Sequence, residues 1–288
     1  MAKAKVYEIK DFKQSSVTPQ LYVNRLGDHV KGHRFTNLPH KHDFYFFMLV
    51  TKGHGTHEID FVKYPVKAGS IFMMQPGQMH FWRLSKDIEG FVFFHSKEFY
   101  EHEYTHSAIH HFKFFESFQS SPYTAADKKT IGTLSGLLLE MLSEFDTRKA
   151  FRLQKLHALM NVVYINVARI YSGGEVQKSS RYLDIFHQFE EFVEQHYKTE
   201  KLPRFYAAKL NITEKHLNRI CRECMNKTST SVVAERVALE AKRLLSQFKQ
   251  NINEIAFHLG FNDPSYFVRF FKKQTGDTPL AFQKKYFN

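Results

Sequence analysis

The last third of this 288-residue chain contains one pattern twice: a short helix, a tight turn and a second helix. The first unit covers residues 202–224 and the second covers residues 252–273. Apolar residues recur at helical spacing through 181–288, without strand-like alternation. An amphipathic segment at 231–247 joins the two units. The helical spacing throughout therefore predicts an all-α domain here.

Each unit has suitable residues where its helices begin and end. In the second unit, Gly260 can end the short helix in the left-handed conformation, and Asp263 with Pro264 can begin the next helix. In the first unit, Asn211 stands at the turn and Thr213 at the cap position of the second helix. Both units therefore have local signals for a sharp turn between two helices.

The second helix of each unit is expected to separate apolar from polar side chains. The residues expected to face inward are Leu217 and Ile220 in the first unit and Tyr266, Phe267, Phe270 and Phe271 in the second. Those expected to face outward are Lys215, Asn218, Arg219 and Arg222, then Ser265, Val268, Arg269, Lys272 and Lys273. Arg and Lys pair with guanine and Asn with adenine in the DNA major groove. For either unit alone, an ordinary solvated helix surface is the alternative interpretation.

Positive charge is concentrated in the same region. The chain has a net charge of +12, and residues 195–288 hold 17 Lys or Arg against 8 Asp or Glu. A basic domain attracts a polyanion through counterion release. Charge alone is weak support, because many basic domains bind no nucleic acid.

Residues 182–288 resemble the DNA-binding domain of the AraC/XylS family of bacterial regulators. The resemblance rests on Ile255-Ala256, Leu259-Gly260-Phe261, Ser265-Tyr266-Phe267, Arg269, Phe271-Lys272, Thr278-Pro279 and the segment 236–245. It implies base contacts from Lys215, Asn218 and Arg219 in the first unit, and from Pro264, Ser265, Val268 and Arg269 in the second. Asn211 departs from the glycine common at the first turn, and Cys221 from a bulky apolar residue.

The first hundred residues have a different texture. Apolar runs at 44–50, 71–74 and 91–94 and an alternating stretch at 56–62 are separated by Gly and Pro turns. Short strands with such turns indicate an antiparallel sandwich or barrel. Two amphipathic helices are expected within about 125–171. The fold class is therefore α+β with two domains.

The histidines of this part resemble those of a cupin barrel. His40 and His42, the glycine and proline turns that follow, and His80 carry the resemblance. In enzymatic cupins such histidines bind a metal together with a Glu, but only Phe and Met stand at 46–48. A divalent metal held by these three imidazoles is one alternative. We expect no cofactor, and interpret the domain as the sensor of an unknown small-molecule effector.

The effector site is expected to use aromatic, Met and His side chains of the barrel. The candidates are His40, His42, Phe44, Phe46, Met48, Phe72, Met74, His80 and Trp82. Plain core packing is the alternative for each of them. The histidines within 102–111 and the pair Cys221 and Cys224 are interpreted as surface residues and structural thiols, not as metal or redox sites.

These observations predict a sequence-specific DNA-binding transcription regulator that is not an enzyme. We expect residues 1–171 to sense an effector and dimerise, 172–180 to be a linker, and 181–288 to bind double-stranded DNA. We expect a homodimer that activates transcription and contacts RNA polymerase. We also expect a cytoplasmic location, without a signal peptide or a membrane span. The alternatives are a metal-dependent cupin enzyme and an effector-independent regulator whose barrel only dimerises.

Overall fold

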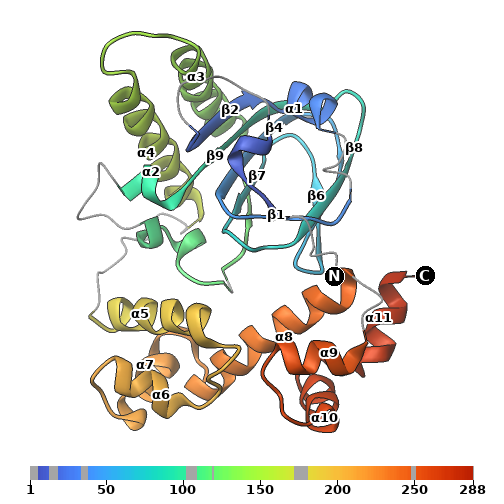
Figure 1. Cartoon of the computed structure of the whole chain (residues 1–288). Coiled ribbons are helices and arrows are strands. Elements are labelled where there is room, and N and C mark those ends of the chain that lie inside the picture. The colour runs from blue at the N-terminus through green and yellow to red at the C-terminus, as the bar shows by residue number, and fades with distance from the viewer. Residues whose placement is uncertain are drawn as a thin grey trace. The chain divides into compact units, whose positions relative to one another are not determined.

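The computed structural model describes residues 6–12, 19–33, 38–101, 109–118, 120–171, 181–247 and 251–287. The chain divides into two compact units, Met1–Val176 and Gln177–Asn288 (Figure 1). The predicted linker at 172–180 and the histidines at 102–108 lie outside the described residues. No helix among the residues described is long and apolar enough to cross a membrane.

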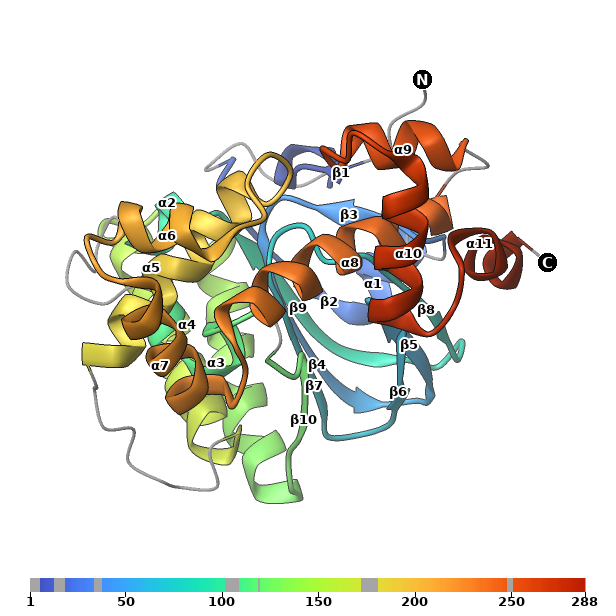
Figure 2. The ribbon, with the colours of Figure 1, turned by 90° about the horizontal axis from the view of Figure 1, so that it is seen from below.

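The first unit contains an antiparallel five-stranded sheet in the order β10-β7-β4-β9-β2 (Figure 2). The strands are β2 Leu21–Arg25, β4 Tyr45–Lys52, β7 Ser70–Met74, β9 Glu89–His95 and β10 Tyr123–Ala125. The apolar runs of the sequence became the central strands β4, β7 and β9. These strands are buried on both faces, which explains why their apolar runs are continuous instead of alternating.

A second, three-stranded sheet has the order β6-β5-β8. It consists of β5 Gly55–Ile59, β6 Val62–Val66 and β8 His80–Leu84, and β1 Val6–Tyr7 pairs in parallel with β3 Lys41–His42. Two backbone hydrogen bonds also join His40 to His80. The β-rich, cupin-like architecture is confirmed, although among the residues described hydrogen bonds do not join the two larger sheets into one closed barrel.

Alternate residues of the five-stranded sheet serve two cores. Phe46, Met48 and Phe94 face the interior that this sheet shares with Trp82 of the three-stranded sheet. Their neighbours, such as Phe47, face α3 Lys128–Phe145 and α4 Arg152–Tyr171. The period of two along a strand thus divides one apolar run between a barrel-like interior and a helix-covered outer face. The helices α3 and α4 fall where helical spacing predicted them.

Short helices complete the first unit. They are η1 Ile9–Asp11, α1 Leu26–Gly32, α2 Lys97–Glu101, η3 Ile109–His111 and η4 Lys113–Phe115. A buried hydrogen bond of 2.7 Å joins Nε2 of His95 on β9 to the Tyr164 hydroxyl on α4. The Nδ1 of His95 lies 2.8 Å from the carbonyl of Ser96, so Nδ1 donates there and Nε2 accepts from tyrosine. This contact fixes the helix pair to the sheet.

One predicted strand is shorter than expected, because β5 ends at Ile59. The alternating stretch at 56–62 is interrupted by a two-residue turn between β5 and β6, because Asp60 and Phe61 both have positive φ, 44° and 73°. Two positive φ values in succession are the geometry of the hairpin turn that matches strand twist. Phe61 has no turn propensity of its own, so the position of this turn was not evident from the sequence. The short strands β1, β2, β3, β6, β8 and β10 were also not predicted.

The second unit is helical throughout its described residues, as expected. Its helices are α5 Arg181–His196, α6 Pro203–Lys209, α7 Glu214–Met225, α8 Ser229–Gln247, α9 Ile252–His258, α10 Pro264–Thr275 and α11 Pro279–Phe287 (Figure 1). The helix pairs α6–α7 and α9–α10 are the two repeated units of the sequence. The long helix α8 connects them.

Candidate nucleic-acid interface

The first helix pair has the turn that its sequence predicted. Asn211 adopts the left-handed conformation with φ 54°, and the Thr213 hydroxyl accepts from the His216 N–H at 3.2 Å. Leu217 and Ile220 are completely buried on the inner side of α7. The neighbouring Cys221 is buried too, and burial raises the pKa of its thiol to about 12. That thiol is therefore protonated at neutral pH.

The outer side of α7 carries three of the four predicted DNA-contacting residues in exposed positions: Lys215, Arg219 and Arg222. The Arg219 guanidinium carbon lies 5.4 Å from the centre of the Tyr182 ring on α5. Contact with an aromatic face restrains a guanidinium while leaving its N–H donors available. Arg219 is thus presented to solvent on a supported side chain.

Asn218 is used differently from its neighbours. It is only half-exposed, and its Oδ1 accepts from both the backbone N–H and the hydroxyl of Ser229, at 2.9 and 3.0 Å. Ser229 is the first residue of α8, whose N–H has no partner within its own helix. Bidentate pairing with adenine also needs the amide oxygen as acceptor. The structure therefore shows Asn218 bracing the start of α8.

The second helix pair is capped as predicted. Gly260 has φ 74°, and the Asp263 carboxylate accepts from the Ser265 N–H at 2.8 Å. Pro264 is the first residue of α10. A Cβ at Gly260 would lie 1.9 Å from the Lys198 carbonyl oxygen, so this position requires glycine both for its conformation and for the close approach.

The outer side of α10 exposes Ser265, Arg269, Lys272 and Lys273, while Pro264 and Val268 are half-buried. Phe267 and Phe271 form the buried stripe. The expected inward position of Tyr266 is wrong, because its side chain is 55% exposed. It is one residue away from the buried stripe, which turns it about 100° around the helix. The Arg269 guanidinium lies 6.0 Å from its ring.

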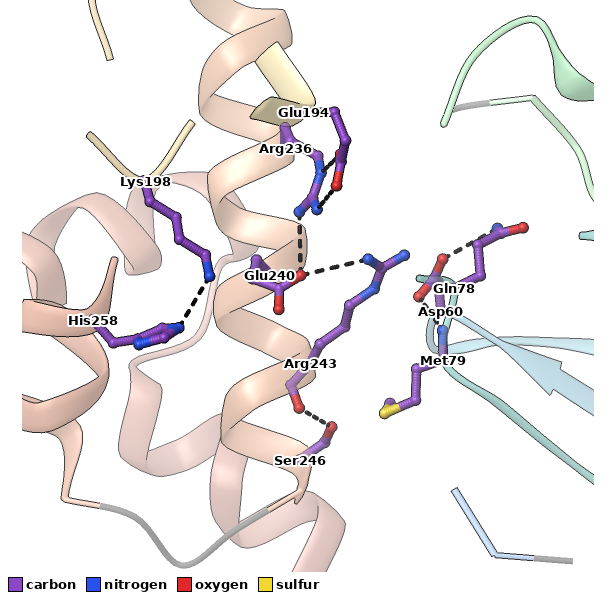
Figure 3. Close-up of polar contacts among 10 residues, drawn as sticks. All are labelled: Asp60, Gln78, Met79, Glu194, Lys198, Arg236, Glu240, Arg243, Ser246 and His258. Atoms are coloured by element: carbon purple, nitrogen blue, oxygen red, sulfur yellow. Dashed lines mark hydrogen bonds and ion pairs between the residues drawn. The ribbon is translucent and has the colours of Figure 1, made fainter. Parts of the chain in front are cut away.

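A buried arginine on α8 joins the helices behind the first pair (Figure 3). Arg236 is 4% exposed and makes two hydrogen bonds to the Glu194 carboxylate on α5, at 2.5 and 2.7 Å. It lies 4.0 Å over the Tyr197 ring and 3.3 Å from Glu240, which also contacts Arg243 at 3.5 Å. Burial disfavours its charge, but the hydrogen bonds and charge of Glu194 outweigh this and raise the pKa of Arg236. This network fixes α5 to α8.

The segment after α5 also contacts the second helix pair. Lys198 Nζ donates to His258 Nε2 of α9 at 3.3 Å (Figure 3). Lys201 Nζ donates to the Gly260 carbonyl at 3.3 Å and lies 4.7 Å from the centre of the Phe261 ring. Partial burial lowers the pKa of Lys201. Through these contacts, the segment that follows α5 supports the second helix pair, so the two helix pairs share a framework besides α8.

The aromatic and methionine residues predicted for effector binding lie together inside the first unit. They share one apolar core and are 0–2% exposed: Phe44, Phe46, Met48, Phe72, Met74 and Trp82. His40, His42 and His80 adjoin this core and are 1–4% exposed. Sequence reasoning missed a fourth histidine, His57, whose Nε2 lies 2.8 Å from His80 Nδ1.

Burial keeps these imidazoles neutral. It lowers the pKa of His40 to about 4, that of His42 to about 3, and those of His57 and His80 well below the usual value. Among the residues described, no three His, Cys, Asp or Glu side chains are arranged to hold a metal ion. The weaker alternative of a metal at His40, His42 and His80 is thus not supported by their geometry.

Both units match known families. A family described as an AraC-like ligand binding domain matches residues 21–163, and one described as a helix-turn-helix domain matches residues 206–285. A ligand-binding β-rich unit followed by a double helix-turn-helix unit defines a DNA-binding transcription regulator, a class that is not enzymatic. The chain belongs to the AraC family of transcription regulators.

Two relatives from Bacillus subtilis align with most of the chain. YfiF, an uncharacterised helix-turn-helix regulator, is 24% identical and the alignment covers 88% of this chain and 80% of YfiF. YdeC, another such regulator, is 22% identical over 96% of this chain and 95% of its own. Among solved structures, ToxT of Vibrio cholerae matches 93% of this chain and all of its own at 12% identity, with a TM-score of 0.43.

Proposed function

We propose that this regulator reads a specific promoter site with α7 and α10 in successive major-groove segments, about one helical turn apart. The observation that carries the proposal is the matched pair of exposed cationic helix faces on one framework, built by α5 and α8. In the first segment the contacts come from Lys215, Arg219 and Arg222. In the second segment the main base contact comes from Arg269. Pro264, Ser265 and Val268 approach bases there, while Lys272 and Lys273 contact phosphates.

The two helices are unequal in this proposal. On α7, Arg219 is supported by Tyr182 and has neighbouring cations, so it supplies most of the sequence readout. On α10, the capped start and the two exposed lysines favour phosphate contacts that fix the position on the duplex. Asn218 contributes indirectly, by fixing the start of α8 relative to α7.

The matched variants Arg219→Ala and Lys272→Ala test this division. Arg219→Ala is expected to weaken binding to the selected site by about 1–3 kcal/mol and to relax the preference at one base pair. Lys272→Ala is expected to weaken all sequences alike and to reduce the salt dependence. Titrations of a selected and a scrambled duplex at several salt concentrations measure both. Equal loss on both duplexes with Arg219→Ala would contradict a base contact.

The first unit is proposed to regulate this binding. An effector held in the interior of residues 1–171 would change how the two units, or two protomers, are arranged, provided that it binds one arrangement more tightly. Residues 172–180 serve as linker to the DNA-binding domain 181–288. We further propose transcription activation through RNA polymerase and a cytoplasmic location. The sensor role fails if a bound small molecule leaves DNA affinity, site spacing and transcription unchanged.

Dimerisation is proposed through α3 and α4. Both helices expose apolar side chains on the side away from the sheet: Leu139 is 43%, Val162 41% and Ile165 38% exposed. A second copy covering these residues would remove that surface from water. Val162→Glu is expected to shift the sedimentation coefficient from dimer to monomer. An unchanged coefficient would contradict this interface.

A further inference from the structure

Four polar rings lie together in the interior of the first unit. His80 is at the centre of the group, with ring centroids 5.0 Å from His42, 5.1 Å from His57 and 5.4 Å from Trp82. None of the four side chains is more than 1% exposed. The rings come from β3, β5 and β8, and Phe46 packs against His42, His80 and Trp82.

Each of these rings has a nitrogen without a hydrogen-bond partner among the described residues. These atoms are His42 Nε2, His57 Nδ1, His80 Nε2 and Trp82 Nε1. Leaving a buried donor or acceptor unpaired is costly, and folded proteins contain few of them. Four such atoms on four neighbouring rings, all inside the domain that matches a ligand-binding family, point to a ligand that pairs with them.

The hydrogen bonds that are made determine which of the four atoms donate. His42 Nδ1 lies 3.1 Å from the Phe44 carbonyl, so Nδ1 has the proton and Nε2 is an acceptor. His57 Nε2 and His80 Nδ1 share one proton at 2.8 Å. Whichever of them donates, one outer nitrogen of this pair is an N–H and the other is an acceptor. The Trp82 N–H is always a donor.

The group thus offers two donors and two acceptors while its histidines are neutral. Burial lowers the pKa of all three, so neutrality holds at physiological pH. An ionised carboxylate provides acceptors only, and it would leave both imidazole acceptors unpaired beside a negative charge. A hydroxyl or a carboxamide can donate and accept at once.

We propose that the rings of His42, His57, His80 and Trp82 bind an uncharged small molecule with a carboxamide or hydroxyl group that both donates and accepts hydrogen bonds. Phe44, Phe46 and Phe72 surround the rings and suit an apolar or aromatic body on the same ligand. This inference rests on the proposed sensor role of the first unit and specifies the chemistry of its effector.

The sole tryptophan of the chain, Trp82, reports on the site directly. Its emission is measured on the full chain at neutral pH while two isosteric pairs of probes are added through the millimolar range: benzamide against benzoate, and formamide against formate. We expect a saturable change with at least one amide, and binding of the matching carboxylate that is at least about tenfold weaker. A carboxylate that binds as tightly as its amide overturns the proposal, and so does the absence of a saturable response to both amides.

A pair of variants, one on β5 and one in the loop just before it, tests the site itself. His57→Gln keeps a polar atom near His80 Nδ1 but removes the ring nitrogen Nδ1, so it should weaken the amide by about tenfold. His54→Gln changes an exposed histidine three residues away and should leave the affinity unchanged. Urea midpoints verify that both variants are folded. Equal effects of the two variants on amide binding would overturn the assignment.

The outcome is separable from that of the DNA experiments. The proposed base and phosphate contacts come from residues of the second unit, so failure of the amide probes leaves the DNA-binding proposal unaffected. If an amide binds at Trp82 but does not change DNA binding, the site stands and the sensor role fails.

Discussion

Replacing Arg236 with methionine removes a buried charge network and keeps most of the apolar volume of the side chain. Two hydrogen bonds to Glu194, one to Glu240 and the contact with Tyr197 are lost. Breaking a buried ion pair costs about 3–5 kcal/mol. Glu194 is 60% exposed and can be hydrated again, and Glu240 keeps Arg243, so we expect a loss of about 2–4 kcal/mol.

Urea unfolding measures this loss separately for the two units. Far-ultraviolet circular dichroism follows the helices of both units, more of which belong to the second, whereas the emission of Trp82 follows the first unit alone. Because small domains lose about 1–3 kcal/mol of stability per molar urea, the helical transition of Arg236→Met should shift down by roughly 1–3 M. The Trp82 transition should not shift.

The matched control is Lys52→Met, which removes an ion pair of 3.0 Å to Glu89 in which both side chains are more than half exposed. We expect no measurable loss of stability there, since solvent screens exposed pairs. If Arg236→Met costs no more than this control, or shifts both transitions equally, the reasoning that the Arg236 network fixes α5 to α8 is refuted.

Three further changes test local features of the two units. Gly276→Ala should lower the stability of the second unit by about 1 kcal/mol, because its φ of 83° strains any residue with a Cβ. Gly260→Ala should lower it by about 2–4 kcal/mol, because the added Cβ also meets a backbone oxygen. Equal losses would contradict the close approach at Gly260. Asn218→Ala should lower the stability by about 1 kcal/mol, because Ser229 loses its hydrogen-bond acceptor. Asn218→Asp keeps a side-chain acceptor at this position. Similar thermal midpoints for the two variants would therefore contradict the brace. In acid, histidine in the unfolded chain takes up a proton near pH 6.5, whereas burial lowers the pKa of His42 in the folded chain to about 3. The stability of the first unit, followed by tryptophan emission, should therefore fall as pH decreases from about 6.5 towards 4. A flat profile would contradict the buried neutral histidines.

Local signals in the sequence were the most informative. Caps and turns depend on a few adjacent residues, so Asn211, Thr213, Gly260 and Asp263 could be placed before any tertiary contact was known. The apolar run that became β4 was also recognisable, since a strand buried on both sides needs no alternation. The family resemblance added an expectation of which helix faces approach DNA, and both domain families are confirmed.

Features that depend on distant partners were not recognisable. The brace between Asn218 and Ser229 arises only when α8 begins beside α7, so the sequence alone gave no sign of it. The base contact expected for Asn218 stays a prediction. His57 did have a signal, because the period of two in β5 places it on the same face as Ile59. The turn at Asp60 and Phe61 had only the weak signal of Asp60, since the positive φ of Phe61 accompanies the pairing of β5 with β6.

The central claim is that α7 and α10 read two successive major-groove segments of one site. Methylation interference at guanine N7 tests it most directly, on a duplex that the full chain selects from a random library. We predict two clusters of interfering guanines whose centres lie about 10 base pairs apart, with the Arg219→Ala variant insensitive to methylation in one cluster only. A single cluster, or interference that Arg219→Ala leaves unchanged in both, would contradict the account.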